Sequence, residues 1–520
     1  MDIIDQGFPE WTELGQDSGL DPLGMQRPIE LIYQSLLPGI STITLRYRYY
    51  SFFAWILKYY EDHIEDTKEN SDPHQFRVFQ RRCEALFALA CFYGDYELGI
   101  AGIEWAGREI GKVSHQDDKS TKIDFSVGAD LKSEPEHKYL RNNGGAFFAI
   151  YSTQMSEMGL VHLDKRPIPF CSERALPLAE AFEKNIGSLC EDFFQAAKSA
   201  EVSLSLLDKL NVLKPASLNP QSTEHKILKD ILLGKVSNPL PADQMRKQTM
   251  LAILSLASLL KKTPKSEELK WSWFEPSSKI SSQIIDFEEN DVIKFWAAYQ
   301  AFDLMRLAYE NLLYAALAIL EGAENRRLSL NVLIAEMMSN FTFSENQSWK
   351  SFKSAMIENE EFGSTIKRIY EELSDAHATG TVELQIRASF ALIIALSSRY
   401  DALIETIEKV PRGLEHFRSI DTEMKFLSDK DNKNARNVIA EVIGERVLKR
   451  HLWVASRKFR NQRAYTYLME PDDGFLRYRT DFTVTPSSPR LEQAIRFLKD
   501  IDLIDESGIT ELGRAELEKA

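Results

Sequence analysis

The stretch of residues 31–60 constrains the fold most, because it contains a helix that is apolar on nearly every side. Pro38 and Gly39 break the chain, and hydroxyl side chains just after them offer caps for a helix over residues 45–60. One face carries Leu45, Tyr49, Phe52, Phe53, Ile56 and Tyr60, and the opposite face carries Tyr47, Tyr50, Trp55 and Leu57. A helix that is apolar on both faces must be surrounded by protein.

Two arginines, Arg46 and Arg48, lie inside this aromatic segment with no acidic residue nearby in the sequence. If they are buried, each needs a partner from elsewhere in the chain, because an unpaired buried charge is very unfavourable. One interpretation is a core helix whose arginines stack on aromatic rings and pair with distant acids. The other is an anion-binding pocket for a phosphate or a carboxylate, which guanidinium groups bind well.

The length of 520 residues exceeds what one hydrophobic core usually supports, so about two to four domains are expected. A net charge of −15 argues against a protein that coats nucleic acid over its whole surface, but a local basic patch remains compatible with it. Cys83, Cys91, Cys171 and Cys190 form no C-x-x-C pair and are expected to be buried thiols. The first residues lack the features of a signal peptide, and the longest apolar run, 249–260, is too short to cross a bilayer. A cytoplasmic protein without a membrane partner is therefore expected.

Helical periodicity dominates the sequence, which predicts a mainly α, multi-domain helical scaffold. Residues 1–188 are expected to form an N-terminal helical domain, 189–430 a central all-helical domain, and 431–520 a C-terminal basic domain. Winged-helix-like α/β modules are predicted near residues 145–185 and at the C-terminus, where a helix, a short hairpin and a capped helix follow one another.

Several single elements can also be placed. Helices are expected over residues 289–321, 383–407 and 434–449, with strands from about Leu452 and a β-hairpin around the turn at residues 471–474. A helix is expected to begin at Pro489 and to leave Arg490, Gln493 and Arg496 facing outward, and Thr510 is expected to cap the following helix.

Positive charge is concentrated near the C-terminus, where residues 446–496 hold eleven Lys and Arg against five Asp and Glu, a local charge of +6. Basic residues interleaved with aromatic ones are typical of proteins that bind a nucleic-acid backbone. The candidate nucleic-acid-binding residues are Lys449, Arg450, Arg457, Lys458, Arg460, Arg463, Arg477, Arg479, Arg490 and Arg496. The alternative is a basic face that docks the acidic helical domain or an acidic partner protein.

One catalytic pattern is present. Arg446 and His451 satisfy the R-x4-H spacing of the helical ribonucleases called HEPN, in which His activates the ribose hydroxyl and Arg stabilises the developing charge. Val447 follows the Arg, where that family usually has a polar residue. Asp124, Asp130 and Lys132 faintly resemble a metal-dependent nuclease layout, but a solvated acidic loop explains them better. No cofactor or metal motif is found.

Two segments resemble uncharacterised bacterial proteins from anti-phage defence and mobile-element gene neighbourhoods. Those proteins carry a P-G-x-S/T-x-x-x-x-R-x-R-Y-Y/F run near the N-terminus, matched here by Pro38, Gly39, Ser41, Arg46, Arg48, Tyr49 and Tyr50. The sequence SPRLEQAIRFLKDIDLID at residues 488–505 is similar to the end of the same proteins. The resemblance covers about a tenth of the chain, and it implies a bacterial, cytoplasmic, multi-gene system without implying catalytic residues.

The first functional hypothesis is a non-enzymatic subunit that binds nucleic acid, DNA rather than RNA, through residues 446–496 and binds partner proteins through its helical body. A related hypothesis is a kleisin-like adaptor whose terminal winged helix docks on an ATPase. The alternative from another class is a ribonuclease that uses Arg446 and His451.

Overall fold

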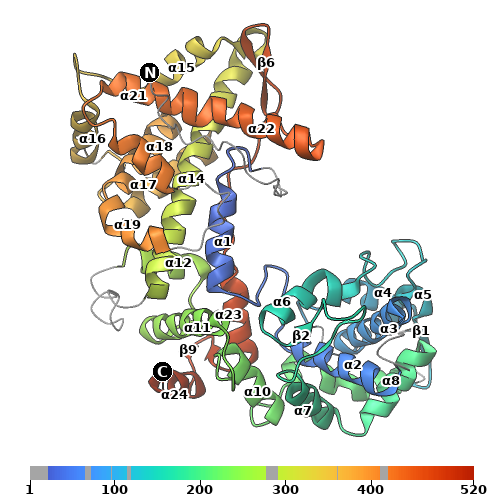
Figure 1. Cartoon of the computed structure of the whole chain (residues 1–520). Helices are drawn as coiled ribbons and strands as arrows, with labels where there is room; N and C mark the ends of the chain where they lie inside the picture. The colour runs from blue at the N-terminus through green and yellow to red at the C-terminus, as the bar shows by residue number, and fades with distance from the viewer. Residues whose placement is uncertain are drawn as a thin grey trace. The chain divides into compact units, whose positions relative to one another are not determined.

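The computed structural model describes residues 21–64, 72–94, 97–113, 119–276, 291–359, 361–409 and 420–519 (Figure 1). Helix accounts for 64% of the structure and strand for 6%, which confirms the prediction of a mainly α fold. Within the described ranges the strands form four small antiparallel sheets, three of two strands and one of three strands.

The chain forms two compact units, and each is assembled from segments that are distant in the sequence. Unit 1 comprises Met1–Ser35 and Glu267–Ser488, and unit 2 comprises Leu36–Ser266 and Pro489–Ala520. This partition differs from the three consecutive ranges expected from the sequence. The difference arises because the last residues of the chain pack against the segment that follows Leu36.

The elements of unit 2 are mostly helices joined by short connections. They are α2 (Tyr49–His63), α3 (Pro73–Phe92), α4 (Ile103–Val113), β1 (Lys122–Asp124), α5 (Ser126–Ala129), η1 (Phe147–Tyr151), α6 (Ser152–Glu157), β2 (Val161–His162), β3 (Phe170–Cys171), α7 (Leu176–Ile186), α8 (Leu189–Ser199), β4 (Glu201–Ser203), α9 (Leu204–Lys209), η2 (Leu210–Leu213), η3 (Pro215–Ser217), α10 (Thr223–Leu232), α11 (Pro241–Leu260), α23 (Leu491–Asp500), β8 (Ile504–Asp505), β9 (Gly508–Ile509) and α24 (Glu511–Glu518).

Helix α2 is the centre of unit 2, as its two apolar faces predict, and α3, α7 and η1 pack around it. Its rings meet aromatic rings of α3, α7, α8, η1 and α23. Tyr49 stacks on Tyr151, with ring centroids 4.7 Å apart, and the ring centroid of Trp55 lies 4.4 Å from that of Phe194. The helix begins at Tyr49, four residues later than predicted. The residues just before it form a turn, and the backbone N–H of Tyr47 donates to Asp500 Oδ2 at 2.8 Å.

The two segments that carry the bacterial resemblance lie in contact within unit 2. Gln493 Nε2 donates to the carbonyl of Thr42 at 3.0 Å, and the ring of Phe497 stacks on Tyr47 at 4.6 Å. Arg490 also donates to the carbonyl of Ile40. The expectation that Arg490 and Gln493 face outward was therefore wrong, because the backbone carbonyls of the N-terminal turn need these donors. These residues of the two segments therefore have a structural role.

Both segments predicted as winged-helix-like have a helix, a two-stranded antiparallel hairpin and a second helix. In the first, η1 and α6 lead into β2 and β3 and then α7. In the second, α23 leads into β8 and β9, and the Thr510 side chain caps α24 by accepting the N–H of Gly513, as predicted. The start of α23 lies at Leu491 rather than at the expected Pro489. Assignment of either segment to the winged-helix class stays a prediction.

Unit 1 contains the remaining elements, and α1 and α12 each extend one residue past its boundary. They are α1 (Gln26–Leu36), α12 (Ser266–Phe274), α14 (Asp291–Gly322), η4 (Glu324–Arg326), β5 (Arg327–Leu328), α15 (Leu330–Met338), α16 (Trp349–Glu358), α17 (Ile366–Thr379), α18 (Val382–Ser397), α19 (Tyr400–Lys409), α20 (Ile420–Ser428), α21 (Ala435–Glu441), η5 (Val442–Leu448), α22 (Lys449–Gln462), β6 (Met469–Asp472) and β7 (Phe475–Tyr478).

The long helix predicted over residues 289–321 is present as α14, a 32-residue helix that runs through unit 1 with α18 packed along it (Figure 1). The helix expected over residues 383–407 is divided into α18 and α19. The helical segment 434–449 was expected to give way to strands near Leu452, but it continues through η5 and α22 to Gln462. The continuation is stabilised by burial of Val454 and Ala455 against the rest of the unit.

The predicted hairpin follows α22. Strands β6 and β7 pair in register from Met469 opposite Tyr478 to Asp472 opposite Phe475. The turn consists of Asp473 and Gly474, whose φ angles are +48° and +81°. Two residues with positive φ define the tight turn that Asp-Gly sequences favour. Strand β5 pairs with the other side of β7, which completes the three-stranded sheet.

Candidate nucleic-acid interface

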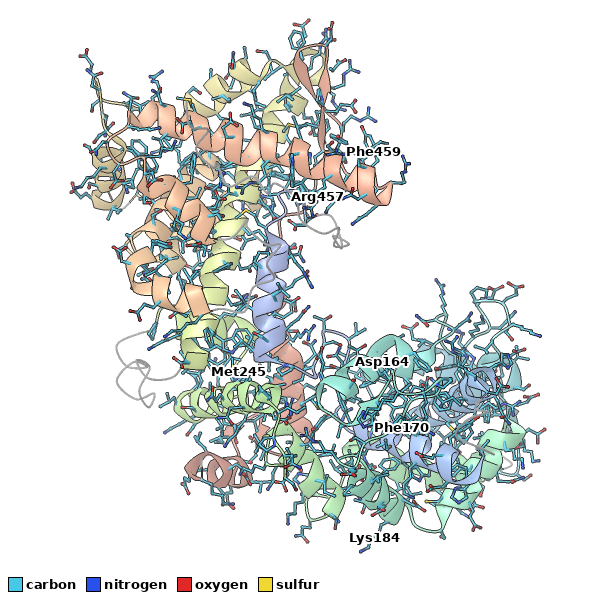
Figure 2. The ribbon with its side chains drawn as sticks, viewed as in Figure 1. Asp164, Phe170, Lys184, Met245, Arg457 and Phe459 are labelled. Atoms are coloured by element: carbon cyan, nitrogen blue, oxygen red, sulfur yellow. The ribbon has the colours of Figure 1, made fainter. Side chains whose placement is uncertain are left out.

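Helix α22 divides its basic side chains between a buried side and an exposed side. Arg450 and Lys458 lie with His451 on the side that packs into unit 1. Residues three and four apart follow one another along the opposite side. This exposed side, the basic stripe, consists of Lys449, Trp453, Arg457, Arg460 and Arg463, each exposed or half-buried. Figure 2 labels Arg457 on the last turns of the helix.

The stripe carries more positive charge than its local carboxylates neutralise. Lys449 Nζ pairs with Glu445 at 2.5 Å, and the guanidinium of Arg457 lies 5.3 Å from the ring of Trp453. In the described ranges no carboxylate lies within ion-pair distance of Arg460 or Arg463. Part of the explanation is structural, because positive charge near the C-terminus of a helix is favoured by the helix dipole. The helix dipole does not occupy the N–H donors of Arg460 and Arg463, so these guanidinium groups can still bind an anion.

The three-stranded sheet of unit 1, two of whose strands follow α22 in the sequence, carries a second cluster of charged side chains. Arg327 on β5 lies opposite Arg477 on β7, which in turn lies opposite Glu470 on β6. Because alternate residues of a strand share a face, Phe475 lies on the same face as Arg477. Leu476 and Met469, on the other face, are buried. The outer side, the sheet face, consists of Arg327, Glu470, Asp472, Phe475 and Arg477, together with Arg479 just beyond β7, which pairs with Glu470.

Ion pairs hold the arginines of the sheet face in place. Arg477 pairs with Asp472 at 2.5 Å, and Arg327 approaches the same carboxylate at 3.4 Å. Arg479, just beyond β7, pairs with Glu470 at 3.3 Å. All three arginine side chains remain between 36% and 47% exposed, so these pairs orient the guanidinium groups without covering them.

Exposed aromatic rings connect the stripe to the sheet face. Phe459 on α22 (Figure 2) meets Tyr465 edge-on with centroids 6.3 Å apart. The guanidinium of Arg479 lies 6.0 Å from the ring of Tyr465, and that of Arg327 lies 4.9 Å from the ring of Phe475. The stripe and the sheet face therefore form one continuous surface, the arginine–aromatic surface.

Sequence reasoning missed Arg326 and Arg327, which lie between α14 and α15. Asn325 and Arg326 have φ of +55° and +54°, and they form the turn that brings β5 beside β7. The guanidinium of Arg326 lies 5.1 Å from the ring of Tyr478. A basic pair followed by alternating apolar and polar residues was the available signal. Its strand partner, about 150 residues later in the sequence, could not be found from local pattern.

Two of the predicted basic residues are neutralised inside unit 1. The Glu423 carboxylate of α20 is fully buried, and it accepts from Arg446 Nη2 at 2.9 Å and from Arg450 Nη2 at 2.5 Å. These two arginines are 7% and 5% exposed. They lower the pKa of Glu423 to about 2 in spite of its burial. The prediction that Arg450 binds nucleic acid is therefore wrong for this structure, because an internal acid already occupies its guanidinium.

His451 is buried, and both of its ring nitrogens have backbone partners. Nδ1 lies 3.1 Å from the carbonyl of Pro22, and Nε2 accepts the N–H of Leu468 at 3.0 Å. This pattern requires a neutral ring with its proton on Nδ1. Burial lowers the pKa of His451 to about 4, so it stays neutral near pH 7. With Arg446 paired to Glu423 as well, neither member of the R-x4-H pattern is placed to reach a substrate.

The buried neutral state of His451 predicts a dependence of stability on pH. The unfolded side chain has an ordinary pKa near 6.5 and the folded one a pKa of about 4, so the unfolded state binds more protons between these values. Acidification from pH 7 to pH 5 is expected to remove about 2 kcal/mol of stability through this group. Urea denaturation at the two pH values measures the loss.

The comparison with His451→Gln isolates this contribution. Burial raises the pKa of Glu310 to about 7 in the same unit, which acts in the opposite direction, but that effect is common to both proteins. The variant is expected to be less sensitive to acidification than the parent by about 2 kcal/mol. Equal sensitivity of the two proteins would contradict a buried neutral His451.

The other predicted basic residues are placed in three ways. Lys458 is 2% exposed, with Nζ 3.4 Å from the carbonyl of Asp21, so its assignment to a nucleic-acid surface is wrong. Arg490 donates to Ile40, as described above, and belongs to unit 2. Arg496 also belongs to unit 2, where it is exposed on α23. The arginine–aromatic surface thus retains Lys449, Arg457, Arg460, Arg463, Arg477 and Arg479 from the predicted set.

Arg46 and Arg48 follow the interpretation of buried arginines paired with distant acids. Arg48 bonds both oxygens of Glu224, each at 2.9 Å, and Nη1 donates to the carbonyls of Val212 and Lys214. Arg46 bonds Asp500 at 3.0 Å and also Glu97. An external phosphate would have to displace these carboxylates, so the geometry gives no support to an anion pocket.

Asp124 and Asp130 each accept a backbone N–H two residues later, and they therefore serve as local turn caps. The cysteines are free thiols, three of them buried and Cys190 half-buried. None of the described helices combines the length and apolar character needed to cross a membrane.

No family model matches the sequence, and neither a curated protein nor a solved structure is significantly similar to it.

Proposed function

We propose that this protein is a non-enzymatic subunit that binds nucleic acid through the arginine–aromatic surface of unit 1. One observation carries the proposal: in a protein with a net charge of −15, exposed arginines gather on one continuous surface together with exposed rings. Guanidinium groups bind phosphates strongly, and aromatic rings offer contacts to bases or sugars. DNA is the expected nucleic acid.

The ribonuclease alternative has less support. A nuclease needs a base and a cation at the scissile phosphate, within hydrogen-bond reach. His451 is fully buried between two backbone groups, and Arg446 is bound to Glu423. The proposal therefore assigns binding, not catalysis, to this part of the chain.

The biological setting is also a proposal, and it rests on the resemblance of residues 38–50 and 488–505 to bacterial defence-associated proteins. We infer a cytoplasmic subunit of a bacterial multi-gene system, with partner proteins bound by the helical body. A kleisin-like adaptor is less favoured. In unit 2 the terminal helix α24 is bound to its own chain, since Glu516 pairs with Lys229 at 2.7 Å and with Lys235.

The test is fluorescence anisotropy of the purified protein with labelled duplex DNA over a series of salt concentrations. Changing Arg457, Arg460 and Arg463 together to alanine is expected to weaken binding strongly at low salt. The slope of log K against log salt should fall by about one unit for each phosphate that the variant no longer binds.

A matched variant changes Lys350, Lys367 and Arg368 to alanine, which removes the same charge from exposed positions of α16 and α17 in the same unit. It should bind as the parent does. Equal weakening in both variants would indicate only a nonspecific charge effect. If the parent at low salt bound neither duplex nor single-stranded DNA, the proposed function would be refuted.

A further inference from the structure

We propose that the arginine–aromatic surface takes single-stranded rather than double-stranded nucleic acid, with unpaired bases stacking on Phe459, Tyr465 and Phe475. This inference rests on the proposed function and specifies its ligand. Stacking on aromatic side chains requires bases whose faces are open, and those are hidden inside a duplex. Exposed rings can therefore stack on the bases of a single strand, but they cannot stack on the paired bases of a duplex.

The three rings are unusually exposed for aromatic side chains of a folded protein. Phe459 is 44% exposed, Tyr465 is 54% exposed and Phe475 is 40% exposed. Elsewhere in unit 1, rings such as those of Trp296 and Trp349 are almost completely buried. A single exposed ring needs no explanation, but three rings in one arginine-rich surface suggest a binding function.

Each element of a single-strand site is present beside the rings. Arg479 lies against Tyr465 and Arg327 lies against Phe475, so a phosphate contact and a base contact are available within one or two nucleotides. A guanidinium plane can itself stack on a base. Phe459 adjoins Tyr465, and the ring of Tyr467 lies 5.3 Å from that of Tyr465, which gives a row of rings instead of an isolated one.

The charge of the surface suits one strand. Six arginines, Arg327, Arg457, Arg460, Arg463, Arg477 and Arg479, stand against two carboxylates, Glu470 and Asp472, which gives 6 − 2 = +4. Both carboxylates are bound to arginines of the sheet face. The ion pairs hold the guanidinium planes beside the rings, and Arg460 and Arg463, with which no described carboxylate pairs, add further positive charge. The result is a basic track with stacking platforms along it.

The experiment compares a labelled oligothymidylate of about twenty nucleotides with a duplex of the same length, by anisotropy at several salt concentrations. The parent protein is expected to bind the single strand more tightly. Changing Phe459, Tyr465 and Phe475 to alanine should reduce single-strand affinity by about tenfold for each stacking ring that is removed, and should leave the salt slope unchanged. Duplex affinity should change little.

Two further variants control for folding and for the role of the tyrosine hydroxyl. Tyr465→Phe keeps the ring and removes only the hydrogen bond to Glu470, so it is expected to retain single-strand affinity. Leu384→Ala removes an exposed apolar side chain of α18, also in unit 1, and should have no effect. Circular dichroism of the triple variant verifies that its helical content is retained.

The outcomes separate the two proposals. Equal binding of both ligands, or single-strand binding that the triple aromatic variant retains, overturns this inference but leaves a backbone-binding protein. Binding of neither ligand by the parent at low salt overturns the proposed function as well, and would assign the surface to an acidic protein partner.

Discussion

Replacing Glu423 with alanine is expected to lower the free energy of unfolding of unit 1 by about 3–5 kcal/mol. The parent carboxylate is fully buried and bonds to both Arg446 and Arg450. Its removal takes away the buried carboxylate that both guanidinium groups share. A buried charge without its partner is far more unfavourable than an exposed one.

Hydrogen–deuterium exchange of peptides from α20 and α22 measures this effect in unit 1 itself. Exchange of the protected amides should become faster by between about two and four orders of magnitude. Glu445→Ala is the matched control. It breaks the exposed ion pair with Lys449, next in sequence to Arg446 and Arg450, and should lower the free energy of unfolding by less than about 1 kcal/mol. Similar exchange rates in both variants would contradict the expectation that the buried cluster of Glu423, Arg446 and Arg450 stabilises unit 1.

The stability difference between the parent and Glu423→Ala should depend on pH in one direction. Because the folded pKa of Glu423 is lowered to about 2, the stability that it contributes is present above its unfolded pKa, near 4.3. That contribution is lost as pH falls through the folded value. The difference between parent and Glu423→Ala should therefore be constant near neutral pH and shrink only in acid.

Replacing Arg48 with alanine is expected to destabilise unit 2 by a similar amount, about 3–5 kcal/mol. Arg48 is 1% exposed, and Glu224, to which its Nε and Nη2 donate, is fully buried. Among the described residues, alanine would leave that carboxylate with the side-chain amide of Asn185, at 2.7 Å, as its remaining hydrogen-bond donor. The carbonyls of Val212 and Lys214 would also lose a donor, and the ring of Phe182 would lose a guanidinium 5.2 Å away.

Exchange of peptides from α2 and α10 reports this change. Arg48→Lys is informative beside it, because an ammonium keeps the charge but cannot form the two parallel bonds, so an intermediate loss is expected. Lys58→Ala, on the same helix, breaks an exposed pair with Asp62 and should have little effect. If Arg48→Ala resembled Lys58→Ala, the ion pair would not support the core of unit 2.

The helices of this protein could be predicted because the information is local. The apolar periodicity of α2 and α14, the Thr510 cap and the Asp-Gly turn all lie within a few residues of what they determine. The start of α2 was misplaced for the opposite reason. The group that binds the N–H of Tyr47 is Asp500, 453 residues later, and nothing near Tyr47 indicates it.

The candidate site was predictable in its charge but not in its exposure. The sequence places the basic residues of α22 in one segment, yet the assignment of Arg450 and Lys458 to the inside depends on Glu423 and on the segment near Asp21. Likewise, Arg327 joins the surface only because β5 pairs with β7. Pairing between distant segments is decided by the packing of the whole unit, which a single sequence does not display.

The interleaved course of the chain affects how the protein is made. The partner of Arg46, Asp500, is added to the nascent chain 454 residues after it. At ordinary translation rates this interval is on the order of 20–90 s. Throughout that time the aromatic face of Tyr47 has no Phe497 to cover it. Unit 2 can therefore finish folding only after the ribosome has added α23, and until then the apolar surface that α23 covers stays exposed to aggregation.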